Sequence, residues 1–222
     1  MAFNTAKNIL VGASPLYLST KDSTNAAYEE NMLETGTIAF TKGAKASVAL
    51  EASSDVRNVG YTNNGLQITY NPTYDSVTVD QLLDTAKLFK SAMEVMIATE
   101  LAEGTLENVL AVFGQGSDTK SGTLTKGANA AGNVDETLGL AAGALGIAPT
   151  ERQLFAVGQA PTVVTPDTER VYYARRVLSV QQSQFTLARN AASTFPVTFR
   201  LLPDANYSGA EYGKIIDRVT KN

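Results

Sequence analysis

The spacing of apolar and polar residues predicts a chain built mainly of β-strands. Apolar side chains recur at every second position over much of 66–70 and 89–101, which is the period of a strand with one buried face. The other segments that alternate in this way, or carry a short apolar run of strand length, are 9–18, 37–40, 46–51, 74–80, 153–158, 169–178, 183–188, 194–202 and 214–219. We expect the 183–188 strand to pair with the 194–202 strand.

A turn signal interrupts the pattern early in the chain. Asn63, Asn64 and Gly65 tolerate positive φ angles, which tight hairpin turns require. The sequence therefore predicts a hairpin that joins residues 59–62 to residues 66–70.

One segment changes from strand spacing to helical spacing. Leu106, Leu110 and Phe113 recur at intervals of three and four residues. Thr105 or Gly104 can cap the start of this helix, and Gly114 can end it. We predict one short α-helix beside the strands.

Two polar segments lack either period. Residues 19–34 are rich in Lys, Asp, Ser, Asn, Ala and Glu, and they predict the start of a long exposed loop at about 19–58. Residues 114–133 are rich in Gly, Ser, Thr and Lys, and they predict a surface excursion. The whole chain, residues 1–222, is expected to form a single β domain with one core.

Composition narrows the function classes. Hydrophobic residues make up 44% and charged residues 18%, as in an ordinary globular domain. The formal net charge of −4 lacks the positive excess that a sequence-reading nucleic-acid binder needs. A mildly acidic protein is compatible with a conduit through which DNA slides. The chain has no Cys and no His, which removes disulfides, thiolate ligands and the commonest general base and metal ligand.

Targeting segments are not indicated. The first ten residues lack the continuous apolar core of a signal peptide, and residues 138–147 are too short to span a bilayer. We expect a soluble product without an export signal.

Candidate catalytic groups each have a simpler interpretation. The carboxylate pairs Glu29 with Glu30 and Asp80 with Asp84 lie in or beside segments predicted to be exposed, where acids are usually solvated. Ser117 stands three residues before a lysine, as in a Ser-x-x-Lys nucleophile pair, but in a Gly-rich tract instead of a buried helix. No catalytic residue is predicted.

Three arginines lie among tyrosines over residues 170–176. Arg175 and Arg176 face opposite sides of a strand, so they form no basic stripe that could bind single-stranded nucleic acid. We expect Arg170, Arg175 and Arg176 to form ion pairs between subunits.

Two blocks of the sequence resemble a known family. The first runs from Asn58 to Gly114 and contains the turn, the strands and the short helix described above. The second, residues 195–204, reads Phe-Pro-Val-Thr-Phe-Arg-Leu-Leu-Pro-Asp. Together, in this order, they resemble the tail tube (major tail) proteins of long-tailed bacteriophages.

This resemblance implies a fold and a structural role. It implies a β-sandwich or half-barrel with long hairpins and one flanking helix, six copies of which join edge to edge into a ring whose strands close a β-barrel. Stacked rings would form the hollow tail tube through which viral DNA passes into the host bacterium. The polar face of the hairpins would then line the lumen, and alternation gives these candidate lumen-facing residues: Ser76, Thr78, Asp80, Glu94, Glu100, Gln184, Thr186, Thr198 and Arg200.

The opposite face would pack beneath the helix. Its residues are Val77, Val79, Val95, Ile97, Phe185, Leu187, Val197, Phe199 and Leu201. The resemblance further implies a virion protein assembled in the host cytoplasm, with tape-measure, tail-tip and terminator proteins as partners and with no cofactor, metal or membrane. It also makes the 19–34 loop and both termini candidates for contacts between rings.

Two other functions remain open on the sequence. A monomeric β-sandwich could recognise a carbohydrate or a protein through residues 115–133, although that loop has no aromatic residue for stacking. An enzyme would need a buried, perturbed acid or base, which the pattern does not indicate.

Overall fold

The computed structural model describes most of the chain. It covers residues 12, 14–23, 25–81, 84–114, 124–128, 134–140, 149–161, 168–181, 183–187, 189 and 192–219. The elements in these ranges are β1 (Leu16–Ser19), α1 (Met32–Thr35), α2 (Ala46–Ala52), β2 (Val56–Asn58), β3 (Thr62–Thr78), β4 (Thr85–Leu101), α3 (Leu106–Val112), β5 (Leu124–Ala128), β6 (Val134–Leu138), β7 (Arg152–Gln159), β8 (Thr168–Ser179), β9 (Phe195–Leu201) and β10 (Gly213–Val219). The protein is mainly β, as the sequence predicts.

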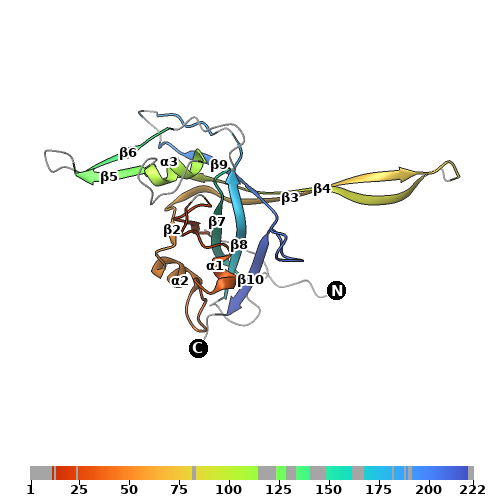
Figure 1. Ribbon diagram of the computed structural model, residues 1–222, viewed down its shortest axis with the longest axis horizontal. Helices are drawn as coiled ribbons and strands as arrows, with labels where there is room; N and C mark the ends of the chain where they lie inside the picture. Colours follow the sequence, from red (N-terminus) through yellow and green to blue (C-terminus); the bar gives the residue numbers. More distant parts are fainter. Residues whose placement is uncertain are drawn as a thin grey trace.

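Most strands belong to one antiparallel sheet, shown in Figure 1. Its order is β2-β1-β7-β8-β9-β4-β3, and β10 also pairs with β8. Residues 168–174 of β8 pair with β10, whereas residues 177–179 pair with β9. The sheet therefore branches along β8, and β9, β4 and β3 fold over β7 and β8 as a second layer.

The main core lies between these two layers. Leu154 and Ala156 of β7 meet Ile97 of β4 and Phe199 of β9, and α3 closes one end with Ala111 and Val112. Alternation explains the arrangement, because every second residue of each strand points into this core. The buried members of β4 and β9 that were predicted to pack together do so: Val95, Ile97, Val197, Phe199 and Leu201.

A second core covers the other face of the same sheet. Tyr17, Phe155 and Tyr173 alternate with the residues of the main core, and Phe155 stacks on Tyr173 with ring centroids 4.7 Å apart. Met32, Ile38, Ala46, Leu50 and Val56 pack on them. Strands β1, β7 and β8 are thus covered on both faces.

This second core corrects the prediction of a long exposed loop at about 19–58. The segment contains α1, α2 and β2, and Met32 and Leu50 are fully buried. Ala46 and Leu50 stand four residues apart on one face of α2, so the run predicted as a strand over 46–51 is a helix. Residues 37–40 form no strand either.

The predicted hairpin at Asn63–Gly65 is also wrong. Strand β3 continues through this point, and Asn64 and Gly65 adopt φ angles of 60° and 68° within it. The pairing with β4 jumps from Asn63↔Glu100 to Gln67↔Ala98, which makes the site a bulge. The Thr99 hydroxyl donates to the Gly65 carbonyl at 2.8 Å and holds the bulge in place.

The short helix is confirmed as α3. The Thr105 side chain accepts a hydrogen bond from the Asn108 amide at the start of the helix, as a capping residue does. Gly114 follows the helix with a φ of 64°, which favours glycine. Leu110 is buried, whereas Phe113 is partly exposed at the end of the helix and contacts Phe185.

Of the strands predicted after residue 150, some are confirmed and one is wrong. The segments 153–158, 169–178 and 214–219 lie in β7, β8 and β10. Residues 183–187 form no strand, and β9 pairs with β4 and β8 instead. Within the predicted excursion, residues 124–128 form β5, which pairs with β6, and the stretches 115–123 and 129–133 lie outside the described residues.

Candidate assembly surface

A two-stranded ribbon projects from the body of the protein (Figure 1). Strands β3 and β4 have 17 residues each, several times the usual strand length. At one end Ile97 and Leu101 of β4 are buried in the core. At the other end, residues 71–78 and 85–92 are exposed, with only Pro72 partly covered. We call these two paired segments the arm.

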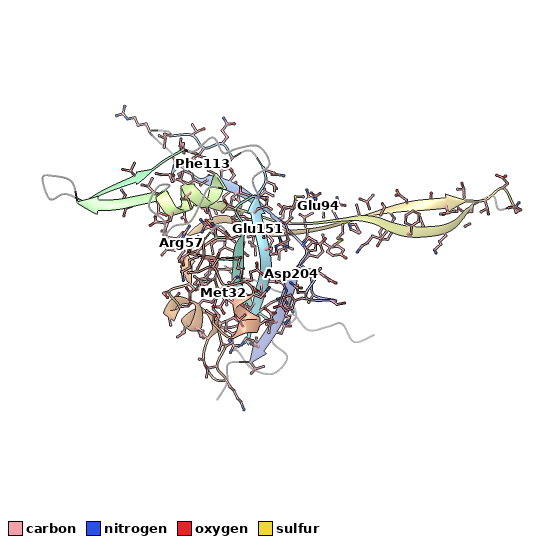
Figure 2. The ribbon with its side chains drawn as sticks, viewed as in Figure 1. Met32, Arg57, Glu94, Phe113, Glu151 and Asp204 are labelled. Carbon is pink, nitrogen blue, oxygen red and sulfur yellow. The ribbon has the colours of Figure 1, made fainter. Side chains whose placement is uncertain are left out.

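The arm carries large apolar side chains in the open, and Figure 2 shows side chains projecting along its length. Tyr74 is 58% exposed, Leu88 65% and Phe89 45%. Paired residues share a face, so Phe89 lies with Asp75 on one face while Leu88 lies with Ser76 on the other. Apolar groups therefore stand on both faces of the arm, although an isolated two-stranded ribbon is marginally stable in water.

Nearer the body, the outer face of β3, β4 and β9 is polar. Gln67, Thr69 and Asn71 pair with Ala98, Met96 and Glu94, so these six side chains share this face. Thr198 and Arg200 extend the face across β9. The Arg200 guanidinium lies 3.7 Å from the Glu94 carboxylate, and the Asn63 amide donates to Glu100 at 3.2 Å. We call this surface the polar face.

The structure brings four of the nine predicted lumen residues together. Glu94, Glu100, Thr198 and Arg200 all lie on the polar face. Arg200 is the cation among these four residues, and it pairs with Glu94.

The other five predicted lumen residues are exposed elsewhere. Strand β3 alternates without a break from Gln67 to Thr78, because the register shift between Thr73↔Ala92 and Tyr74↔Lys90 adds its extra residue to β4. Ser76 and Thr78 therefore lie on the face of β3 opposite to Thr69 and Asn71. Asp80 lies beyond the end of β3, and Gln184 and Thr186 lie outside any strand.

Three residues predicted for the core are exposed instead. Val77 and Val79 stand on or beside the arm, where no second layer covers them, and Leu187 is 80% exposed in a non-strand segment. Apolar character did not lead to burial at these three positions, because burial depends on a covering layer that ends at the body.

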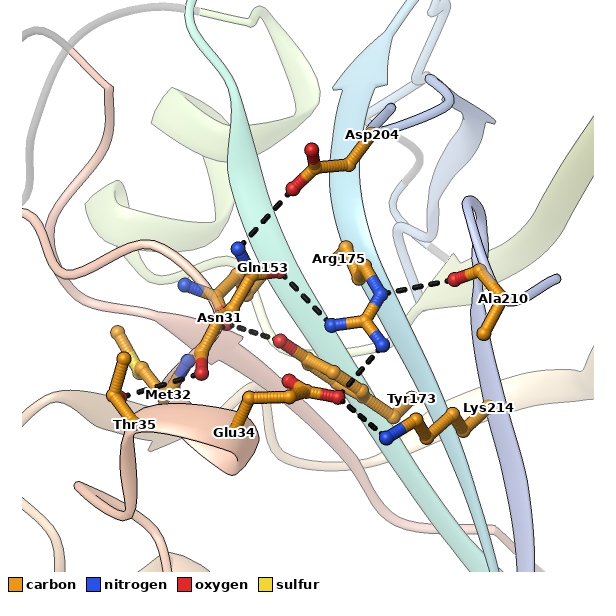
Figure 3. A network of polar contacts seen from close by, with 10 residues as sticks. All are labelled: Asn31, Met32, Glu34, Thr35, Gln153, Tyr173, Arg175, Asp204, Ala210 and Lys214. Carbon is orange, nitrogen blue, oxygen red and sulfur yellow. Dashed lines mark hydrogen bonds and ion pairs between the residues drawn. The ribbon is translucent and has the colours of Figure 1, made fainter. Parts of the chain in front are cut away.

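A buried polar cluster lies on the opposite face of the sheet, where α1 meets β8 and β10 (Figure 3). Arg175 is only 1% exposed. Its guanidinium lies 2.6 Å from a Glu34 carboxylate oxygen, and it donates to the Asn31 side chain at 3.1 Å and to the Ala210 carbonyl at 3.0 Å. The Tyr207 ring lies beneath it, 3.8 Å from ring centroid to guanidinium carbon.

Further residues complete this cluster. Lys214 of β10 lies 2.9 Å from Glu34, and Asn31 donates to Asp204 at 3.1 Å. The Gln153 side-chain oxygen accepts from the Tyr173 hydroxyl at 2.8 Å and from the Met32 amide at 3.0 Å. The cluster thus fastens α1 to β7, β8 and β10 through groups that are far apart in the sequence.

The charges of the cluster set the protonation of Glu34. Burial raises the pKa of the Glu34 carboxyl, but Arg175 and Lys214 outweigh that effect and hold the pKa below its ordinary value. Burial also raises the pKa of the Tyr173 hydroxyl. Glu34 is therefore ionised at neutral pH and acts as an ion-pair partner.

The arginines correct the expectation of ion pairs between subunits. Arg175 pairs with Glu34, Arg176 with Glu151 and Arg170 with Asp217, each within the chain and at 2.6 Å. No local pattern indicated these partners. Glu151 lies 25 residues from Arg176, Asp217 lies 47 residues from Arg170, and Glu34 belongs to a segment that was predicted to be a loop.

Catalytic groups do not converge in the described part of the chain. Hydrogen bonds from Thr37 and Thr35 lower the pKa of Glu29, which stays ionised on the surface, and Asp80 and Asp84 are exposed beside the arm. Ser117 and Lys120 lie outside the described residues. Among the described side chains, no group of three or more acidic residues is placed to hold a metal ion.

The helices in the described ranges are short, and none is long and apolar enough to cross a membrane. A scan of protein-family models and a search of curated proteins give no match to this chain.

Proposed function

We propose that the chain is a structural virion protein, the major tail tube subunit of a long-tailed phage. Six copies form a ring, and rings stack into the hollow tube through which viral DNA enters the host bacterium. The tape-measure, tail-tip and terminator proteins are its partners in the virion, and assembly takes place in the host cytoplasm. The subunit binds no cofactor and catalyses no reaction.

The observation that carries this proposal is the long, open edge of β3. In the described part of the chain β3 pairs with β4 alone, so its other edge presents unpaired N–H and C=O groups over up to 17 residues. Such an edge is a template for another chain. Edge-to-edge pairing around a closed ring satisfies these groups without leaving an end at which uncontrolled aggregation begins.

The polar face supports the proposal that β3, β4 and β9 line the lumen. Glu94, Glu100, Thr69 and Thr198 offer acidic or small polar groups, which repel DNA or attract it only weakly. Arg200 is the cation on this face, and Glu94 offsets its charge. DNA would slide past such a wall without being held.

Electron microscopy of the purified protein tests the proposal. Negative staining at high concentration is expected to show rings or hollow tubes with six-fold end views, and light scattering should give a mass that is a multiple of six chains. Assemblies of another symmetry would contradict the ring. A protein that stays monomeric even when tail-tip proteins are added would favour a monomeric binding module.

Added positive charge tests the lumen assignment. Thr69→Lys with Thr198→Lys is expected to leave tube diameter unchanged and to make the tubes retain DNA in a salt-dependent way. Val48→Lys with Ala52→Lys, on the exposed side of α2, adds the same charge away from the polar face and serves as the control. Equal DNA retention by the two variants would place the polar face outside the lumen.

A further inference from the structure

The bulge in β3 carries the one Asn-Gly pair of the sequence, Asn64 and Gly65. An asparagine side-chain amide and the backbone nitrogen of the next residue can react with each other, and such an intramolecular attack has a large advantage over attack by an external group. Glycine obstructs the attack least, because it has no Cβ beside its nitrogen. The pair thus combines the two residue types that favour this reaction.

The bulge interrupts the strand ladder around this pair. Residues 64–66 have no partner in the register of β3 and β4, which passes from Asn63↔Glu100 to Gln67↔Ala98. The other edge of β3 is open in the described part of the chain. A regular ladder holds a strand extended through its hydrogen bonds, and this restraint opposes the bending that ring closure requires. The restraint is weakest where glycine follows asparagine.

Water reaches both residues. Asn64 and Gly65 are exposed, and beyond the neighbouring residues no described atom lies within 4 Å of the position that a Cβ on Gly65 would take. A shallow cavity of about 220 Å³ opens beside them, and Gln67, Glu100 and Thr198 are among the residues that line it. The site therefore has room for a reacting carbonyl and for the water that the reaction consumes.

We propose that Asn64 and Gly65 form a site of spontaneous deamidation. The Gly65 backbone nitrogen gives up its proton to water or hydroxide and attacks Cγ of Asn64. A new bond forms between that nitrogen and Cγ, the bond between Cγ and Nδ2 breaks, and ammonia leaves. Water then adds to either carbonyl carbon of the five-membered imide and opens it to aspartate or isoaspartate. The net change converts an amide and water into a carboxylate and ammonium, and it needs no oxidant or reductant.

The reaction changes the charge of the polar face. An exposed carboxyl is ionised at neutral pH, so each conversion adds one negative charge to a chain whose formal net charge is −4. The new charge stands at the cavity that Glu100 and Thr198 line. The reaction itself needs only the free chain. Its effect on DNA passage rests on the proposed function, because in a tube each converted subunit would make the lumen wall more acidic.

Mass spectrometry of the folded protein tests the site. After incubation at neutral and mildly alkaline pH, Asn64 is expected to gain about 1 Da, faster at the higher pH, and to yield both aspartate and isoaspartate. Two exposed asparagines are internal controls. Asn71 precedes Pro72, which has no N–H to lose, and Asn206 precedes the bulky Tyr207. A mass gain no faster at Asn64 than at Asn206 would overturn the proposal.

The unfolded chain separates the effect of the bulge from that of the dipeptide. In guanidinium the backbone around Asn64 is unrestrained. The folded chain is expected to deamidate at Asn64 within about tenfold of this rate, a barrier difference of at most about 1.4 kcal/mol, because the bulge leaves the pair accessible. A folded chain that stays unmodified while the unfolded chain is converted would overturn the proposal.

Two variants test the chemistry. Gly65→Ala places a methyl group beside the attacking nitrogen and should slow the mass gain about tenfold or more. Since alanine is strained at the Gly65 φ of 68°, thermal unfolding checks that this variant is folded. Asn64→Gln keeps a neutral amide but would need a six-membered ring, so the mass gain at residue 64 should be lost. An unchanged rate in Asn64→Gln would refute the imide route.

Assembly assays distinguish this site from the proposed function. Rings or tubes formed by a protein that stays unmodified at Asn64 would refute the deamidation site and leave the proposed function intact. Deamidation at Asn64 in a protein that forms neither rings nor tubes, even with tail-tip proteins added, would support the site and contradict the proposed function.

Discussion

Strand β4 runs from the arm into the body, and its two halves differ in what covers them. Val95, Ile97 and Leu101 lie under a second layer of strands and are buried, whereas Leu88 and Phe89 have no layer over them and stand in water. The residue types are similar in the two halves. The difference teaches that apolar alternation indicates a strand, while the neighbouring layer decides whether that strand is core or surface.

This contrast gives the two halves different tasks. The body half contributes to the stability of the single chain, because its apolar area is removed from water on folding. The arm half gains little from folding alone and can gain from association with another copy. Variants in the body should therefore change unfolding, and variants in the arm should change assembly.

The largest expected effect is on the body core. Phe199→Ala should lower the free energy of unfolding by about 3–5 kcal/mol, since Phe199 is 1% exposed and its removal leaves a cavity between the layers. Urea denaturation of the monomer measures this change. Phe89→Ala, on the arm, is the matched control. A similar loss of unfolding free energy in both variants would contradict the distinction between arm and body.

The buried polar cluster should come next. Glu34→Leu should lower the free energy of unfolding by about 3 kcal/mol or more, because it leaves the Arg175 guanidinium buried without its anion. Glu34→Leu combined with Arg175→Met should recover much of the loss, as apolar pairs of similar size often replace buried ion pairs. The more exposed ion pair between Arg170 and Asp217 serves for comparison. Asp217→Asn should lower the free energy of unfolding by at most about 1 kcal/mol. A double variant less stable than the sum of both single losses would contradict this account.

Acid should weaken the body through the same carboxylate. The pKa of Glu34 is lower in the folded chain than its ordinary value of 4.5, so the unfolded chain binds the proton more readily. The stabilisation is complete above pH 4.5 and is lost as the pH falls through the folded pKa. Urea midpoints measured at decreasing pH should fall less steeply for Glu34→Gln than for the original protein. Identical slopes would show that Glu34 does not contribute.

The smallest expected effect on stability lies on the arm. Val77→Asp should change the free energy of unfolding by about 0.5 kcal/mol or less, because Val77 is already 43% exposed. Its effect should appear instead in sedimentation or light scattering at high concentration, as a loss of oligomers. A large drop in monomer stability would mean that the arm packs against its own chain.

Local signals predicted most strands and the helix α3. The spacing of Leu106, Leu110 and Phe113 and the cap at Thr105 depend on neighbours within one turn, so the sequence carries the whole signal. The alternation of apolar and polar residues in β4, β8 and β10 likewise depends only on residues two positions apart.

Predictions failed where a distant partner decides the conformation. The run at 46–51 is short enough to be a strand or a helix, and it is a helix whose first amide is capped by the Glu169 carboxylate, 123 residues away. Asn64 and Gly65 suit a turn, but β4 pairs on both sides of them and keeps β3 extended. A signal for α2 did exist, since Ala46 and Leu50 are apolar at a spacing of four.

The predicted lumen residues also include some that local alternation placed correctly and some that it did not. The sequence predicted that Glu94, Glu100, Thr198 and Arg200 share a polar face, because each lies on a regular stretch of strand. It misplaced Ser76 and Thr78, because Val77 and Val79 were expected to face the core. Strand β3 alternates without a break from Gln67 to Thr78, so Ser76 and Thr78 lie on the face of Ile68 and Tyr70, opposite to Thr69 and Asn71.

By itself, the sequence determined that this protein is mainly β and where most strands and α3 lie. It also determined that the chain has no excess of positive charge. These properties follow from backbone preferences and from side chains a few residues apart. The tertiary structure alone decided that residues 19–58 cover a second face of the sheet, that Arg175 pairs with Glu34, and that the arm stands free of the body. The physical reason is that burial and ion pairing depend on groups brought together across more than a hundred residues, which no local pattern records.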